Sequence, residues 1–113
     1  MSNRDLKLLL EDMLESALKI KRYTSNLDFD TFVNDDKTVD AVVRNFEIIG
    51  EAANRIGPDF KIMNSDIEWN RIRGFRNRIV HEIVWTIIEN DLDKLIVEIK
   101  YLISNSNNDQ YYT

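Results

Sequence analysis

Apolar residues recur at intervals of three and four along most of the chain, which is the spacing of one face of an α-helix. The first such segment ends near Tyr23, and Ser2 followed three positions later by Asp5 is a start signal for it. Its apolar positions are Leu6, Leu10, Met13, Leu14, Ala17 and Ile20. Residues 24–36 contain several turn-forming residues and are predicted to form a connector with room for one helical turn.

A second helix is predicted from Thr38 to Ile56. Its apolar stripe consists of Val39, Val42, Val43, Phe46, Ile49, Ala53 and Ile56. Gly57 and Pro58 should end it, because glycine accepts the left-handed capping conformation and proline cannot continue the hydrogen-bond ladder. The positions that widen its apolar face are Ile48, Ile49 and Ala52. A face of this width leaves apolar surface for a second subunit.

A third helix is predicted to begin at a capping box, Ser65 with Glu68 three residues later, and to end close to His81. Its apolar side holds Ile72, Phe75 and Ile79. A last long helix is predicted from Ile83, with a bend at residues 90–91, where helix propensity is weak.

Four amphipathic helices joined by short connections predict an all-α domain, folded as an antiparallel four-helix bundle over residues 1–103. Residues 104–113 are polar and lack periodicity, so we expect a disordered tail there. The length of 113 residues fits one domain.

The composition limits the chemistry that is available to this domain. The chain has no cysteine and one histidine, which excludes disulfides, thiolate metal sites and an ordinary zinc centre. We therefore expect no metal and no cofactor. The first residues mix charges with leucines, and no run is long and apolar enough for a signal peptide or a membrane span. We expect a soluble cytoplasmic protein without a membrane partner.

The formal net charge of −5 argues against general coating of nucleic acid, because phosphate neutralisation dominates such binding. Four of the eight arginines nevertheless fall within eight residues, at Arg71, Arg73, Arg76 and Arg78. No acidic residue interrupts the stretch between Glu68 and Glu82. An acidic body with one basic edge suits a local anionic ligand or an oppositely charged partner.

The basic segment also carries groups that suit a phosphodiester. Arginine binds phosphate oxygens through a planar donor fork, and histidine, with an ordinary pKa of about 6.5, can move a proton near neutral pH. In RNA the neighbouring 2′-hydroxyl can be the attacking group, so neither a metal nor a covalent enzyme intermediate is required. The alternative is structural, with the arginines on a solvated face and His81 near a helix end for its dipole.

The spacing of these groups limits how they can meet. In one regular helix Arg73, Asn77 and His81 share a face, but Arg76 lies about 140° around from His81. Arg76 and His81 then converge only if the helix ends there or if a second copy supplies one of them.

The stretch at 76–81 resembles the signature of HEPN-domain ribonucleases, an arginine, four residues and a histidine, and in particular that of the HepT-like toxins. Residues 40–53 resemble the long second helix of that family, 69–77 its third helix, and 83–85 the opening of its fourth. The three blocks occur in order and cover nearly all of the chain except the tail.

The resemblance implies a dimer in which two signatures form a composite cleft that cleaves RNA. It assigns Arg76 and His81 as the catalytic pair and Asn77 as the accompanying polar residue. Arg73 and Arg78 lie outside the signature, and we expect them to bind RNA because of their charge. The implied function is that of a metal-independent RNA endonuclease, the toxin of a toxin–antitoxin pair.

The implied partner is an MntA-like minimal nucleotidyltransferase antitoxin, which modifies a tyrosine two positions after the signature histidine. That position is Ile83 in this chain, and the sequence passes directly from His81 into the 82–85 block, so the usual loop is absent. Alternative acceptors are Tyr101, Tyr111 and Tyr112. The alternative function is a non-catalytic dimer that binds RNA or the nucleotidyltransferase without cleaving RNA.

Overall fold

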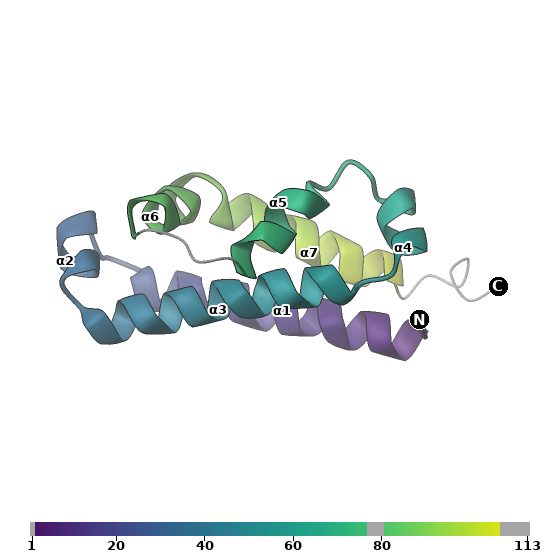
Figure 1. The fold of residues 1–113 in the computed structure, drawn as a ribbon, viewed down its shortest axis with the longest axis horizontal. Helices are drawn as coiled ribbons and strands as arrows, with labels where there is room; N and C mark the ends of the chain where they lie inside the picture. Colours follow the sequence, from purple (N-terminus) through teal and green to yellow (C-terminus); the bar gives the residue numbers. More distant parts are fainter. Residues whose placement is uncertain (1, 77–80, 107–113) are drawn as a thin grey trace.

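A computed structural model describes residues 2–76 and 81–106, and for residues 81 and 82 it describes the backbone alone. Within these ranges every regular element is helical, which confirms the predicted all-α class. Three long helices, α1 (Asn3–Thr24), α3 (Asp36–Arg55) and α7 (Leu92–Ser106), run along the long axis of the molecule (Figure 1). Helix α1 packs against both α3 and α7.

The first half of the chain follows its predicted pattern. Ser2 caps α1 by accepting a hydrogen bond from the backbone N–H of Asp5 at 3.0 Å. The connector holds one short helix, α2 (Phe29–Val33), and Asp35 then caps α3 by accepting from the N–H of Thr38 at 3.2 Å. Each cap satisfies a backbone donor that the first helical turn leaves without an intrahelical partner.

Helix α3 ends at Arg55, so the predicted stop at Gly57 and Pro58 is confirmed. The predicted left-handed conformation of Gly57 is wrong, because its backbone is extended, with φ −67° and ψ 156°. The same two residues also start a helix that the periodicity did not reveal, α4 (Pro58–Met63). Proline is well suited to the first helical position because its missing N–H would have no intrahelical partner there. The buried ring of Phe60 holds α4 on the core.

The prediction for the third helix is wrong in its start and its extent. The helix does not begin at Ser65. Instead, the carbonyl of Asn64 accepts hydrogen bonds from the Ile67 N–H and the Trp69 indole N–H, which keeps this stretch in turns. Helix α5 begins only at Trp69 and ends at Arg73, and a single 3-10 turn, η1 (Gly74–Arg76), follows it.

Two features explain why this helix is short. Gly74 lowers helix propensity by about 1 kcal/mol relative to alanine. Phe75 in η1 is buried with its ring 5.2 Å from that of Phe46, in an edge-to-face arrangement. The packing of Phe75 on α3 therefore competes with continuation of a regular helix.

The last predicted helix is two helices. Helix α6 (His81–Asn90) and α7 are separated at Asp91, which confirms the bend predicted at residues 90–91. Helix α7 continues to Ser106, whose side chain is buried, so residues 104–106 of the predicted tail are helical. The remainder of that tail lies outside the described residues.

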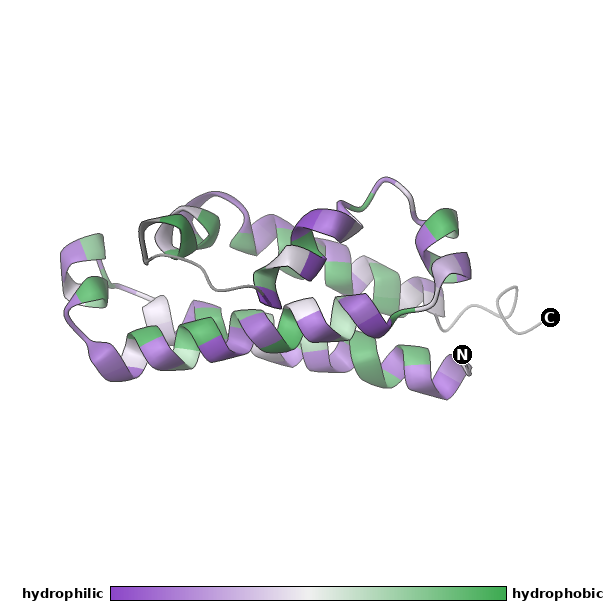
Figure 2. Cartoon of the chain, in the orientation of Figure 1, coloured by the Kyte–Doolittle hydropathy of each residue, from purple (hydrophilic) through white to green (hydrophobic). Residues whose placement is uncertain are grey.

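The chain order gives an up-down-up-down bundle, with α5, η1 and α6 together occupying the third position (Figure 1). Helices α2 and α6 lie at one end of the molecule and α4 at the other (Figure 1). Hydrophobic and hydrophilic patches alternate around the long helices (Figure 2), and the hydrophobic ones form one core. The third position is thus built from several short elements. Arg76 is the last residue of η1, and His81 is the first residue of α6.

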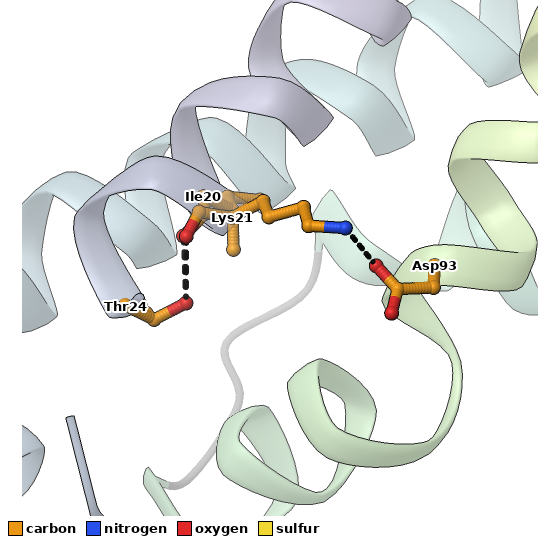
Figure 3. A network of polar contacts seen from close by, with 4 residues as sticks. All are labelled: Ile20, Lys21, Thr24 and Asp93. Atoms are coloured by element: carbon orange, nitrogen blue, oxygen red, sulfur yellow. Dashed lines mark hydrogen bonds and ion pairs between the residues drawn. The ribbon is translucent and has the colours of Figure 1, made fainter. Parts of the chain in front are cut away.

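A contact network joins the end of α1 to the start of α7 (Figure 3). Lys21 Nζ donates to Asp93 Oδ1 at 2.7 Å, and Thr24 Oγ1 donates to the carbonyl of Ile20 at 2.8 Å. The ion pair is exposed, so we expect it to contribute at most about 1 kcal/mol. Burial of apolar side chains is the larger stabilising contribution.

Phe32 should anchor the α2 end of the bundle. Phe32 is fully buried, and its ring lies 5.1 Å from that of Trp85 in α6. Phe32→Ala should lower the free energy of unfolding by about 3–5 kcal/mol, because it removes a buried ring and leaves a cavity. Urea denaturation measures this loss. Phe29→Ala, which removes a half-buried ring from the same helix, should cost clearly less, and equal losses would contradict the assignment.

Candidate functional site

The position of Arg76 depends on a close approach between η1 and α3. A Cβ atom added to Gly50 would collide with the backbone nitrogen of Arg76 and lie 3.0 Å from the carbonyl oxygen of Arg73. Only glycine lets two backbones approach this closely at such a point. Gly50 therefore allows η1 to rest directly on α3, and this contact sets where Arg76 begins.

The side chain of Arg76 extends over the outer face of α3. Its Nη1 lies 3.7 Å from Oε2 of Glu51, and 41% of the side chain is exposed. An exposed pair at this distance is weak because solvent screens it. The guanidinium can therefore exchange this carboxylate for another anion, such as a phosphate.

Arg76 forms part of the wall of an open groove of about 590 Å³ between α1, α3 and η1. The other lining residues are Leu9, Asp12, Arg44, Glu47, Ile48, Glu51, Ala52 and Arg55. Two further arginines, Arg44 and Arg55, thus share the groove with Arg76. The sequence analysis did not predict these two arginines, because they lie far from the basic run. Their spacing of eleven residues, about three helical turns, places them on the same side of α3 and is the signal that could have revealed them.

The structure separates the members of the basic run. Arg71 contacts Asp91, which follows α6, and Glu68, so its charge serves to join α5 to the α6–α7 junction. Arg73 is exposed at the end of α5. Burial lowers the pKa of Lys61, and the nearby charge of Arg73 lowers it further. Arg73 and Lys61 therefore form a second small basic area outside the groove.

The predicted common helical face for Arg73, Asn77 and His81 is wrong, because α5 ends at Arg73. His81 is the first residue of a separate helix, α6. Asn77 and Arg78 lie outside the described residues. The helix that carries Arg73 therefore ends before His81, and the side chain of His81 lies outside the described part of the chain.

Among the described side chains, those of residues 2–76 and 83–106, no three carboxylate, imidazole or thiol groups gather in a cluster that could hold a metal ion. In the same ranges no helix has both the length and the hydropathy that crossing a bilayer requires.

The fold and the site together define a class of small helical-bundle protein. In the third position of this bundle, an arginine is the last residue of a short 3-10 turn, and a histidine is the first residue of the helix that follows. A family model described as Ribonuclease HepT-like matches residues 13–102. The chain belongs to this HepT-like ribonuclease family.

Individual relatives agree with this assignment. A protein of Methanocaldococcus jannaschii named as a candidate RNase is 35% identical over an alignment 107 positions long, which covers 88% of this chain and 98% of that protein. A protein of Thermococcus cleftensis named as a candidate ribonuclease HepT is 33% identical, over 81% of this chain and 90% of that protein. A candidate RNase of Caldanaerobacter subterraneus is 29% identical, with coverage of 83% and 90%. No solved structure matches the chain.

The contact at Gly50 leads to a prediction. Gly50→Ala should lower the free energy of unfolding by about 1–3 kcal/mol, because η1 must move away from the new methyl group. Gly74→Ala is the matched control, since a Cβ at that position meets nothing within 4 Å. The control should be neutral or stabilising by up to about 1 kcal/mol. Chemical denaturation of both variants measures the difference, and a Gly50→Ala protein as stable as the control would contradict the role of this contact.

Proposed function

We propose that this chain is a metal-independent endoribonuclease that acts as a homodimer and as the toxin of a toxin–antitoxin pair. The observation that carries the proposal is the exposed guanidinium of Arg76, held by η1 in an open groove, in the element that precedes the helix of His81. Membership in the HepT-like ribonuclease family supports the reaction class.

The proposed reaction uses the RNA itself as the source of the nucleophile. The 2′-oxygen loses its proton and attacks the adjacent phosphorus, the bond to the 5′-oxygen breaks, and that oxygen takes up a proton. The products are a 2′,3′-cyclic phosphate and a 5′-hydroxyl end. His81 transfers protons, and Arg76 binds the phosphate oxygens and stabilises the charge that builds up on them.

The remaining site residues bind and orient the RNA. Asn77 is assigned to the catalytic centre as a hydrogen-bonding group, on the strength of its place in the signature. Arg73 and Arg78 are assigned to phosphate contacts outside the centre. The exposure of Arg73 supports this role, and its neighbour Lys61 adds a second cation beside it.

Regulation is assigned to a cognate minimal nucleotidyltransferase in the cytoplasm. Ile83 is 53% exposed, but it has no hydroxyl to accept a nucleotide. We therefore expect control by binding, or by modification of a tyrosine elsewhere, and Tyr101 is accessible with 57% of its surface exposed.

Two substitutions separate the roles of the signature residues. His81→Ala should reduce cleavage of a mixed RNA pool in EDTA by about 10²–10⁴-fold and leave RNA binding nearly unchanged, because neutral histidine adds no charge. Arg76→Ala should reduce both cleavage and binding, and it should lower the salt dependence of binding by about one phosphate contact. Arg76→Lys should restore charge without the planar fork, so its activity should stay well below that of the wild type.

The measurements are gel-based cleavage rates and binding titrations at several salt concentrations. Arg71→Ala is a control, because Arg71 is engaged by Asp91 and Glu68, and it should cleave at the wild-type rate. If His81→Ala cleaves as fast as the wild type, the assigned activity is wrong. If the wild type binds RNA and never cleaves it, the protein is the non-catalytic binding module instead.

The regulatory assignment has its own test. Co-expression with a nucleotidyltransferase from a neighbouring gene, followed by intact-mass measurement and peptide mapping, should show either a complex or a nucleotide on a tyrosine. A nucleotide mapped to residues 81–85 would contradict the expectation, because that stretch contains no tyrosine.

A further inference from the structure

The ring of Trp69 joins the short helices α4 and α5. The indole N–H of Trp69 donates to the carbonyl of Asn64 at 3.0 Å, and the ring of Phe60 lies 6.3 Å from that of Trp69 in an edge-to-face arrangement. Phe60, Asn64 and Trp69 are all buried. The two helices therefore pack as one unit, and residues on its surface keep fixed positions relative to one another.

Two cations lie on the same side of this unit. Nζ of Lys61 lies 5.9 Å from the centre of the Trp69 ring. Arg73 is exposed, and it follows Trp69 by four residues, so it lies on the same face of α5 one helical turn further on. Burial lowers the pKa of Lys61, and the charge of Arg73 lowers it further. Lys61 and Arg73, hereafter the α4–α5 cation pair, therefore lie close together.

Within the described part of the chain, no acidic group neutralises the α4–α5 cation pair. The ion pairs between described residues involve the cations of Lys19, Lys21, Arg71 and Arg76. Two cations that lie beside each other without an anion repel one another, and a bound anion would remove this unfavourable interaction. The arrangement is therefore that of an anion-binding site and not that of a structural ion pair.

The cation pair lies beside the arginine that the proposed function places on the cleaved phosphate. The carbonyl oxygen of Arg73 and the nitrogen of Arg76 both approach α3 at Gly50, so one contact fixes the backbone at both arginines. The side chain of Arg76 lies toward Glu51 of α3, whereas the charge of Arg73 acts on α4. Residues three apart in a helical segment have Cβ atoms about 5–6 Å apart. An RNA strand bound at Arg76 can therefore reach the cation pair within a few nucleotides.

A polyanion that leaves Arg76 can follow the groove or cross α5. The groove is also lined by the carboxylates of Asp12, Glu47 and Glu51, which repel phosphates. The route across α5 leads to the cation pair, where no described carboxylate lies within ion-pair distance. The local charges therefore favour the route across α5.

We propose that the α4–α5 cation pair binds a phosphate of the RNA other than the one that is cleaved, and that it directs the strand from Arg76 across α5 toward α4. The proposal rests on the proposed function and extends it with a binding site outside the catalytic centre, in which Lys61 is a new member. The ligand is the phosphodiester backbone. Phosphate contacts carry no sequence information, so this site contributes affinity and strand direction and not base specificity.

The repulsion within the pair can be measured in the protein alone. Arg73→Gln removes one of the two charges, so the pKa of Lys61 should rise toward its ordinary value. The free energy of unfolding should be equal to that of the wild type or higher, because an unfavourable interaction is lost. NMR of lysines with isotope-labelled methyl groups measures the pKa, and Lys61→Arg identifies the signal. If Arg73→Gln leaves the pKa of Lys61 unmoved, the two cations are not neighbours and the proposal is overturned.

Binding is best measured on 2′-O-methylated RNA, which lacks the attacking hydroxyl, so the result does not depend on cleavage. Lys61→Gln and Arg73→Gln should each raise the dissociation constant by about tenfold, because each removes one charge-assisted contact. An RNA of about 12 nucleotides is long enough for both sites. In the double variant, the slope of log affinity against log salt should fall by about 0.7, the value for one phosphate of a single strand.

Matched variants show whether charge at these positions is the cause. Lys61→Arg keeps the charge and should bind RNA as tightly as the wild type. Lys100→Gln and Arg22→Gln make the same charge changes at exposed positions of α7 and α1 and should leave the dissociation constant nearly unchanged. Binding by Lys61→Arg as weak as that by Lys61→Gln would overturn the proposal. Wild-type affinity in both variants of the pair would overturn it too, and would leave an acidic protein face as the ligand.

Cleavage kinetics separate this proposal from the ribonuclease assignment. Lys61→Gln should raise KM and leave kcat nearly unchanged, because the contact is the same in the ground state and the transition state. A fall in kcat at unchanged KM would place the pair in the catalytic centre and overturn its assigned location. A wild type that binds the methylated RNA through the pair and never cleaves RNA supports this site and removes the ribonuclease. A wild type that cleaves RNA with the same KM and kcat as Lys61→Gln overturns this site alone.

Discussion

The backbone of η1 lies directly against α3 at Gly50, and the arrangement of the site depends on this contact. A side chain at position 50 would occupy the space that the nitrogen of Arg76 now fills. The contact fixes the position of Arg76 along α3, and the side chain of Arg76 then lies over the outer face of that helix. The groove and the weak pair with Glu51 both follow from it.

The division of the third position into α5, η1 and α6 costs the core little. Ile72 and Phe75 are buried in the first two of these elements, and Val84 and Ile87 are buried in the third, so each contributes to the same apolar core. A bundle needs a continuous apolar surface more than it needs a continuous helix. Arg76 can therefore close one element and His81 open the next without loss of core packing.

The arginines differ in the acidic side chains that lie beside them, and this difference separates a structural arginine from an available one. Arg71 contacts two acids and joins α5 to the α6–α7 junction, whereas Arg76 has one screened, distant carboxylate. Arg44 and Arg55 line the same groove as Arg76, although the acidic residues Asp12, Glu47 and Glu51 line it too. The groove therefore carries charges of both signs.

The sequence by itself determined the all-α class, the limits of α1 and α3, the break at residues 90–91 and the family, because periodicity, caps and the signature are local properties of the chain. It also led to the prediction that Arg76 and His81 form the catalytic pair. It could not determine that the third helix would stop at Arg73, because that outcome depends on Phe75 packing on Phe46 and on a backbone contact at Gly50. Nor could it separate Arg71 from Arg76, since only tertiary structure brings Asp91 to one and an open groove to the other. Local patterns specify which helices form, and contacts between residues distant in sequence decide where each helix ends and which charge is left available.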